Sequence, residues 1–163
     1  MPTTVAVALG SNLGDRREHL DYAVSRLRLA LQDLRVSRYI ETAPVDVPGE
    51  QPAFLNGAVV GDTTLLPREL LNRLLAIEVE RGRERPFSGA ARTLDLDLVL
   101  FGDQVIKEPG LIVPHPRFRE RRFVLEPLAE VASELVDPMT GTTIGELTCR
   151  LVGDRKDDQL SVR

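Results

Sequence analysis

The stretch RTLDLDLVLFG, residues 92–102, decides the fold, because leucine fills every second position: Leu94, Leu96, Leu98 and Leu100. Side chains of a β-strand point alternately to its two faces, so this spacing predicts a strand with one buried leucine face. The opposite face carries two neighbouring carboxylates, Asp95 and Asp97, followed by Val99 and Phe101. The strand therefore combines a core-forming face with a face that holds two acids.

The two acids predict a cation site. Residues two apart on a strand lie about 6.5–7 Å from each other on one face, so the carboxylates of Asp95 and Asp97 can converge. Two buried acids side by side repel each other and are costly to desolvate, and a divalent cation removes both penalties. Mg²⁺ is usually held by one or two carboxylates together with substrate phosphates. The alternative is that this end of the strand is exposed and both acids are simply hydrated.

The rest of the chain supplies helices and further strands around this one. Apolar runs at residues 4–9, 34–39 (continuing toward 42) and 54–60 predict strands. Helical periodicity after Asn12 or Asp15, either of which could cap the helix, and again from Pro67 to about residue 82 predicts two helices. Loops at 43–53 and 82–91 separate these elements, and the order is strand-helix-strand-strand-helix-strand. This order predicts an α+β, ferredoxin-like antiparallel sheet with helices packed on one face.

C-terminal additions follow this unit. Residues 105–106 and 111–113 predict short strands, residues 118–132 predict helical turns, and residues 143–151 predict a last helix. The 163 residues suit a single domain, 1–163, with a frayed polar tail at about 153–163.

Composition narrows the classes of partner. The net charge of −4 and an aromatic content of 4% argue against nucleic acid, and no stretch is long and apolar enough to span a membrane. Cys149 is the single cysteine, which excludes an internal disulfide and a cysteine-based zinc site. The N-terminus lacks a signal-peptide pattern, so we expect a cytoplasmic protein, and we expect a monomer.

Other polar residues are candidates for a site around the acids. Arginine matches phosphate geometry, and Arg92 adjoins the acid pair, whereas most other arginines of the chain are expected to be solvated. His115 lies between two prolines and could either meet a ligand or act as a structural donor, while His19 is expected on the surface. The Asn56 amide could form hydrogen bonds with a ligand, or it could simply satisfy backbone groups. The LGSNLGD segment (9–15) lacks the spacing and the Lys-Ser/Thr of a nucleotide-binding P-loop.

Five stretches together resemble the 6-hydroxymethyl-7,8-dihydropterin pyrophosphokinase family of folate biosynthesis. They are ALGSNLGDR (8–16), ETAPVDVPGEQPAFLNGAV (41–59), IEVERGR (77–83), RTLDLDLVLFG (92–102) and VPHPRFRERRFVLEPL (113–128). Their order and spacing match the family, and the combination of Arg-Thr-Leu-Asp-Leu-Asp with Val-Pro-His is highly specific. No single one of these stretches is specific for the family by itself.

The resemblance implies a ferredoxin-like fold and the transfer of a diphosphate from ATP to a reduced pterin, with release of AMP. It implies that Asp95 and Asp97 bind two Mg²⁺ ions and that Arg83 and Arg92 hold phosphate during catalysis. It further implies an ATP site of Glu78, Arg85, Leu98, His115 and Arg121, and a pterin site of Thr42, Val45, Phe54, Asn56 and Phe123. Loops 43–53 and 82–91 match those that close over the substrates.

The chain departs from the family pattern at two places. Family members often carry Trp-Gly-Pro-Arg where this chain has Gly89-Ala90-Ala91-Arg92, and the chain has no tryptophan. Phe87 is a candidate substitute for that ring. Pro116 stands where an aromatic residue often follows the histidine. Neither change touches the acids, so we expect altered loop closure and affinity with the chemistry retained.

Two other functions compete with this interpretation. Another two-metal nucleotidyl-transfer enzyme on a ferredoxin-like sheet would release pyrophosphate in place of AMP. A non-catalytic ligand-binding module is also compatible with the fold, because fold does not fix function. An RNA-binding sheet would need exposed aromatics and a basic face, which this composition does not favour.

Overall fold

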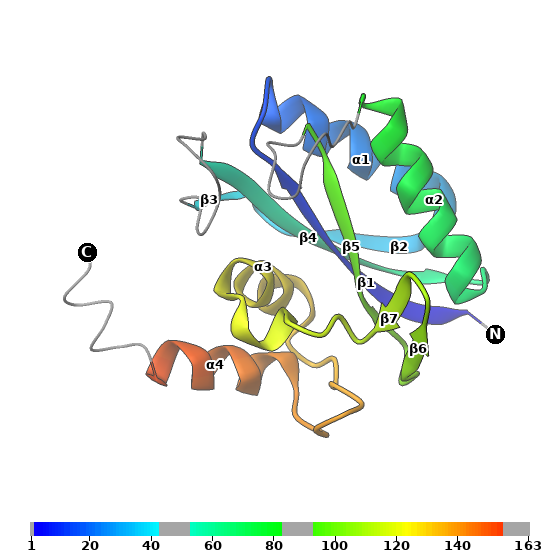
Figure 1. Ribbon diagram of the computed structural model, residues 1–163. Helices are drawn as coiled ribbons and strands as arrows, with labels where there is room; N and C mark the ends of the chain where they lie inside the picture. The colour runs from blue at the N-terminus through cyan, green and yellow to red at the C-terminus, as the bar shows by residue number, and fades with distance from the viewer. Residues whose placement is uncertain (1, 43–52, 83–92, 155–163) are drawn as a thin grey trace.

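The computed structural model describes residues 2–42, 53–82 and 93–154. Its centre is a five-stranded antiparallel sheet in the order β2–β4–β1–β5, with β3 also paired to β4 (Figure 1). The strands are β1 (Thr3–Ser11), β2 (Gln32–Val36), β3 (Ile40–Thr42), β4 (Phe54–Thr63) and β5 (Asp95–Phe101). The strand that contains the two acids is therefore an edge strand, paired with β1 alone among the described strands.

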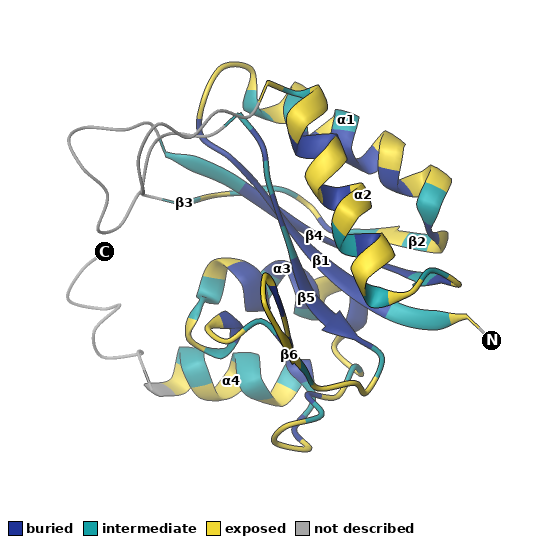
Figure 2. Ribbon diagram, turned by 45° about the vertical axis from the view of Figure 1, so that its right-hand side comes forward, coloured by how far each residue is buried: buried dark blue, intermediate teal, exposed yellow. Residues whose placement is uncertain are grey.

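Helices cover both faces of this sheet (Figures 1 and 2). The predicted pair, α1 (Arg16–Ala30) and α2 (Pro67–Glu80), packs on one face. The C-terminal additions form a second layer on the other face, made of the 3₁₀ helix η1 (Phe118–Glu120), α3 (Arg122–Ala132) and α4 (Ile144–Asp154). A small separate sheet, β6 (Ile106–Glu108) and β7 (Leu111–Val113), leads from β5 to this layer. The predicted α+β, ferredoxin-like class is confirmed.

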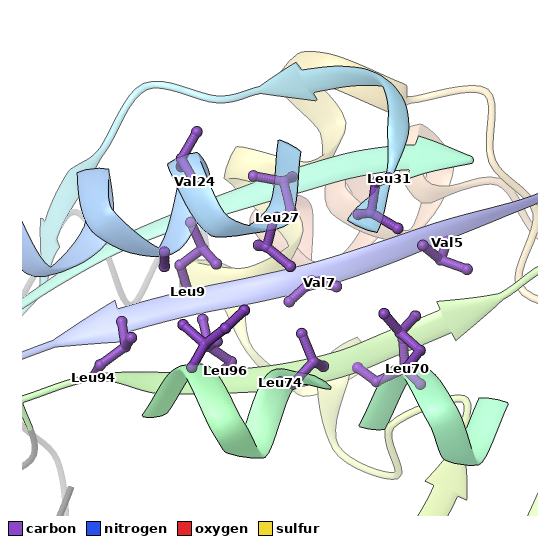
Figure 3. Close-up of a cluster of buried hydrophobic side chains, with 14 of the residues drawn as sticks. Val5, Val7, Leu9, Val24, Leu27, Leu31, Leu70, Leu74, Leu94 and Leu96 are labelled. Atoms are coloured by element: carbon purple, nitrogen blue, oxygen red, sulfur yellow. The ribbon is translucent and has the colours of Figure 1, made fainter. Parts of the chain in front are cut away.

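Local signals explain where the first two helices begin. Asp15, and not Asn12, caps α1, because its carboxylate accepts a hydrogen bond of 3.1 Å from the Glu18 backbone N–H. At α2, Pro67 takes the first position, and Glu69 accepts from the Leu66 backbone N–H at 2.8 Å. Their apolar stripes meet the leucine face of β5 and the odd-numbered side chains of β1 in one cluster (Figure 3). This cluster fixes which face of β5 points away from α1 and α2.

The second predicted strand is interrupted in the structure. β2 ends at Val36 and β3 begins only at Ile40, although both pair with β4. Between them Ser37 exchanges hydrogen bonds with Ala58: its backbone N–H donates to the Ala58 carbonyl at 2.9 Å, and its hydroxyl accepts from the Ala58 N–H at 2.9 Å. The side-chain hydroxyl thus replaces one backbone acceptor of the ladder, which is why the strand breaks there.

The prediction of a strict leucine face on β5 is wrong at its C-terminal end. Leu98 pairs with Val7 and Leu100 with Ala6, so Val99 is an extra residue opposite β1. Such a bulge shifts the alternation by one position. As a result Val99 and Leu100 both pack with α3 and α4, and Phe101 joins the leucine cluster instead.

No described helix is long and apolar enough to cross a membrane. The predicted frayed tail falls mostly on residues 155–163, which lie outside the described residues.

Candidate active site

The acids lie in a row of side chains that crosses three strands on the face opposite α1 and α2. Asp95 of β5 pairs with Gly10 of β1, and Gly10 pairs with Asn56 of β4. Directly paired residues of an antiparallel sheet share a face, so Asp95 and Asn56 flank Gly10. The neighbouring row is Asp97, Ala8 and Ala58, and its two alanines already belong to the core under α3. The acids are thus half-buried at the border between the sheet surface and this core.

Gly10 has no side chain, so the middle position of this row carries no atoms beyond the backbone. A Cβ atom built on Gly10 would lie 3.1 Å from Oδ1 of Asn56 and 3.8 Å from Cδ1 of Phe54. The Asn56 amide is itself held, since its Nδ2 donates to the Thr42 hydroxyl at 2.6 Å and its residue is 5% exposed. The structure therefore brings together Thr42, Phe54 and Asn56, three of the predicted pterin-site residues. Gly10 was not among the predicted site residues, because its role depends on strand register and not on a local pattern.

His115 approaches the acids from the second layer. Its backbone N–H donates to the Val99 carbonyl of β5 at 3.0 Å, and its Nδ1 accepts from the Arg117 backbone N–H at 3.1 Å. Burial and then the positive charge of Arg121 lower the pKa of His115, while Asp95 opposes this shift. Both effects favour the neutral ring, and because Nδ1 accepts from Arg117, the neutral ring carries its proton on Nε2.

Arg121 and Phe123 stand at the start of α3. The Arg121 guanidinium carbon lies 5.6 Å from the centroid of the Phe123 ring, within the range of a cation–π contact. Phe123 is 36% exposed although it belongs to a helix with a buried apolar face. An exposed aromatic ring beside an arginine is suited to a flat, polar ligand.

Two predicted ATP-site residues lie elsewhere. The Leu98 side chain is buried in the leucine cluster on the opposite face from the acids. Glu78 of α2 is 1% exposed, and its carboxylate accepts from the Leu96 backbone N–H at 2.7 Å. Glu78 therefore contacts the free edge of β5, at the residue between the two acids.

The remaining predicted residues fall outside the described part of the chain: Val45, Arg83, Arg85 and Arg92, together with Phe87 and residues 89–91. His19 differs from its prediction as a plain surface residue. Its Nδ1 accepts a hydrogen bond of 2.9 Å from Nε of Arg81, and burial followed by Arg81 lowers its pKa. This contact joins the start of α1 to the end of α2, because the two helices lie side by side (Figure 1).

The residues present fit a cation that brings most of its ligands from a substrate. Among the described residues no group of three or more His, Cys, Asp or Glu could hold a metal ion. Asp95 and Asp97 instead offer two half-buried carboxylates on one face of β5. This donor set is too small for a closed structural site, and it suits Mg²⁺ shared with phosphate oxygens.

Relatives and solved structures agree with this architecture. Over 136 residues the chain is 43% identical to the 2-amino-4-hydroxy-6-hydroxymethyldihydropteridine pyrophosphokinase of Pseudomonas aeruginosa, covering 80% of this chain and 82% of that protein. The enzyme of the same name from Bacillus subtilis is 47% identical over 131 residues, covering 79% and 78%. The folic acid synthesis protein of Pneumocystis carinii is 38% identical over 149 residues, but this chain spans only 20% of its length.

A crystal structure of Plasmodium falciparum HPPK-DHPS shares the fold, with a TM-score of 0.76 and 16% identity over 97% of this chain and 46% of that one. The sequence model of 7,8-dihydro-6-hydroxymethylpterin-pyrophosphokinase (HPPK) matches residues 6–133. This match includes the acid pair, Gly10, Asn56 and His115. The chain belongs to the 7,8-dihydro-6-hydroxymethylpterin-pyrophosphokinase family.

Proposed function

We propose that this protein transfers a diphosphate from ATP to the hydroxymethyl group of 6-hydroxymethyl-7,8-dihydropterin in folate biosynthesis, with AMP as the second product. The observation that carries the proposal is the row Asp95–Gly10–Asn56 in a chain of this family. The row joins a pair of acids suited to a phosphate-bound cation with an amide suited to a heterocycle. Both kinds of group are needed to bring ATP and a pterin together.

Asp95 and Asp97 are the residues that would hold Mg²⁺, as two ions in our proposal. When bound, Mg²⁺ would neutralise the charge of the ATP phosphates, which otherwise repels an oxygen nucleophile. The position of both carboxylates on the acid face, opposite the leucine cluster, supports this role. The role of the protein is to fix the two carboxylates on a strand whose other face is anchored in the core.

The pterin side of the site is proposed to consist of Thr42, Phe54, Asn56 and Phe123, with Val45. Asn56 turns its Oδ1 toward Gly10, and a carbonyl oxygen there can accept a hydrogen bond from an N–H of the pterin ring. The Thr42 contact holds the amide in this orientation. Phe54 and Phe123 supply rings that can stack on the two faces of a bicyclic ligand.

The ATP side is proposed to consist of His115 and Arg121, with Arg83, Arg85 and Arg92. The neutral His115 ring offers Nε2–H as a donor, and Arg121 offers a cation beside it. Arginines suit the charge that develops on the departing AMP. Glu78 and Leu98 are proposed to act indirectly, because they shape the edge and the buried face of β5.

In the proposed reaction the pterin hydroxyl oxygen forms a bond to the β-phosphorus of ATP. The bond between this phosphorus and the oxygen bridging it to the α-phosphorus breaks, and AMP leaves. The hydroxyl proton is released, and we name no general base. Positioning of the two substrates and stabilisation of charge supply most of the acceleration in reactions of this type.

Product analysis tests the proposal. The protein is incubated with ATP, Mg²⁺ and 6-hydroxymethyl-7,8-dihydropterin, and nucleotides and pterins are separated by chromatography. We expect AMP and the pterin diphosphate in equal amounts. Pyrophosphate would point to nucleotidyl transfer, ADP to single phosphoryl transfer, and the absence of products to a binding module; each would reject the proposal.

The monomeric state and the cytoplasmic location remain predictions.

A further inference from the structure

We propose that the ion pair of Arg119 and Asp137 is a positioning device for the ATP side of the site, acting through His115 and Arg121. The inference rests on the proposed function. Neither Arg119 nor Asp137 belongs to the proposed metal, ATP or pterin residues, and neither is expected to touch a substrate. Their effect would be to fix the turn that carries the two ATP-side residues.

The ion pair is strongly built. Arg119 donates from Nε and Nη2 to the two carboxylate oxygens of Asp137, at 2.5 and 2.9 Å. This bidentate geometry gives direction as well as attraction. Asp137 is fully buried, and it also accepts from the Met139 N–H at 3.0 Å and from the Thr140 hydroxyl at 2.8 Å. The Asp137 carboxylate therefore accepts hydrogen bonds from Met139 and Thr140 in addition to those from Arg119.

Arg119 lies in η1, between the two residues it would position. On one side, the Phe118 N–H donates to the His115 carbonyl at 3.4 Å. On the other side, the Arg121 N–H donates to the Phe118 carbonyl at 3.2 Å. Phe118 itself is fully buried in the second-layer core, and the Arg119 guanidinium lies 4.7 Å from its ring centroid.

This turn is therefore attached at two kinds of anchor, an apolar side chain and a buried ion pair. The apolar anchor stabilises the turn through burial, and the bidentate pair adds geometric specificity. His115 is attached to β5 through the Val99 carbonyl, so rotation of η1 would move Arg121 relative to His115. Because Arg121 is part of the cause of the lowered His115 pKa, the two side chains already interact electrostatically.

A purely structural role would have a different signature. Loss of the pair would then lower stability and reduce the binding of both substrates alike. A positioning role predicts damage mainly on the ATP side, because Thr42, Phe54 and Asn56 belong to β3 and β4, whereas Phe123 is the one described pterin-side residue that follows this turn.

The test compares Asp137→Asn with a matched control, Glu134→Gln. Asparagine keeps the shape of the buried side chain but loses the charge and one acceptor. Glu134 lies just beyond α3 and forms an exposed ion pair with Arg35 of β2 at 3.1 Å. Binding of α,β-methylene-ATP and of the pterin is measured separately by calorimetry with the full chain and Mg²⁺, and KM for both substrates is measured alongside.

For Asp137→Asn we expect affinity for the ATP analogue to fall about ten-fold, with pterin affinity unchanged within about two-fold. Arg119→Lys, which keeps the charge but not the fork, should fall between this variant and the wild type. Glu134→Gln should change neither affinity. Equal losses for both ligands, or no loss for the ATP analogue, would overturn the inference.

A milder variant covers the case in which Asp137→Asn does not fold. Thr140→Ala removes a single hydrogen bond to Asp137, and we expect a loss of about two-fold or more confined to the ATP analogue. An unchanged ATP affinity in this variant would then overturn the inference. Failure of the proposed function is distinguished by the wild type, which would form no AMP.

Discussion

At the residue scale, the candidate site depends on a contrast between fixed and half-exposed groups. Asn56 is almost completely buried and hydrogen-bonded to Thr42, so its orientation is set before a ligand arrives. Asp95 and Asp97 are half-buried on the same face. A preset amide suits recognition of a heterocycle, and half-exposed carboxylates suit ligands that bring their own cation.

The carboxylates are expected to matter for turnover and not for folding. In Asp95→Ala, we expect turnover to fall at least about 100-fold, because charge on the ATP phosphates is no longer offset at this position. The free energy of unfolding, measured by urea titration, should stay within about 0.5 kcal/mol of the wild type. Asp103→Ala, an exposed acid in the turn after β5, is the control and should leave both quantities unchanged. Near-normal turnover in Asp95→Ala would exclude the metal-holding role.

The absence of a side chain at Gly10 is expected to be needed for pterin binding. In Gly10→Ala the new methyl group would meet Oδ1 of Asn56 at 3.1 Å, so the amide would have to move. We expect KM for the pterin to rise about ten-fold while KM for ATP stays nearly constant. Gly153→Ala in α4, where a Cβ meets no atom within 4 Å, is the matched control. A Gly10→Ala enzyme with normal pterin KM would contradict the proposed position of the ring.

The two histidines are expected to make stability depend on pH. Burial, followed by Arg81 for His19 and Arg121 for His115, lowers the pKa of each ring below 6.5. The folded protein then binds fewer protons than the unfolded chain once the pH falls below 6.5, so the unfolding free energy decreases in that direction. Above this range both states carry neutral rings and the contribution is constant.

Urea titrations at about pH 7.5 and about pH 5.5 would measure this dependence. We expect His19→Gln combined with His115→Gln to remove most of the decrease, and each single variant to remove part of it. A double variant that loses as much stability on acidification as the wild type would show that other groups are responsible.

At the scale of single elements, β5 is the strand on which both the core and the site depend. Leu96 and Leu98, together with Leu94 directly before the strand, pack against α1 and α2, whereas the bulge at Val99 places Leu100 in the opposite core. The alternation of leucine continues through the bulge in the sequence, so no local pattern could predict the change of face. The start of α1 and α2 could be predicted, because Asp15 and Pro67 act within a single helical turn.

The contact between α2 and β5 is expected to support the acids indirectly. Glu78→Ala would leave the Leu96 N–H buried without its carboxylate partner, at a cost of about 1–3 kcal/mol in the free energy of unfolding. Because Leu96 lies between the two acids, we also expect a lower kcat.

Glu80→Ala is the control for this prediction, since Glu80 forms an exposed ion pair with Arg26 near the same helix end. Glu78→Gln should retain most of the stability, because its amide oxygen can accept the same hydrogen bond. An unchanged unfolding free energy in Glu78→Ala would contradict this account of the β5 edge.

At the scale of the whole molecule, the sheet separates a purely structural face from a face that is shared between core and site. α1 and α2 cover the first face, and α3 and α4 lie on the second (Figure 2). The two acids lie on this second face of β5. The order of strands and helices along the chain and the acid pair could be predicted from the sequence, because each depends on periodicity or on a contiguous motif.

The second helical layer, the Gly10–Asn56 contact and the Arg119–Asp137 pair could not be predicted. Each depends on residues that are distant in the sequence and meet only through strand register or helix packing. Gly10 and Asn56 are 46 positions apart, and Arg119 and Asp137 are 18 positions apart. The partly buried contact of His19 could not be predicted for the same reason, because its partner Arg81 lies at the far end of the next helix.

The fate of labelled phosphorus tests the central claim most directly, namely that the acid face of β5 serves transfer of an intact diphosphate. ATP labelled with ³²P at the α, β or γ position is supplied in separate reactions with 6-hydroxymethyl-7,8-dihydropterin and Mg²⁺. We predict that β and γ label both appear in the pterin product and that α label appears only in AMP. Transfer of γ label alone, or of α label to the pterin, would contradict the account.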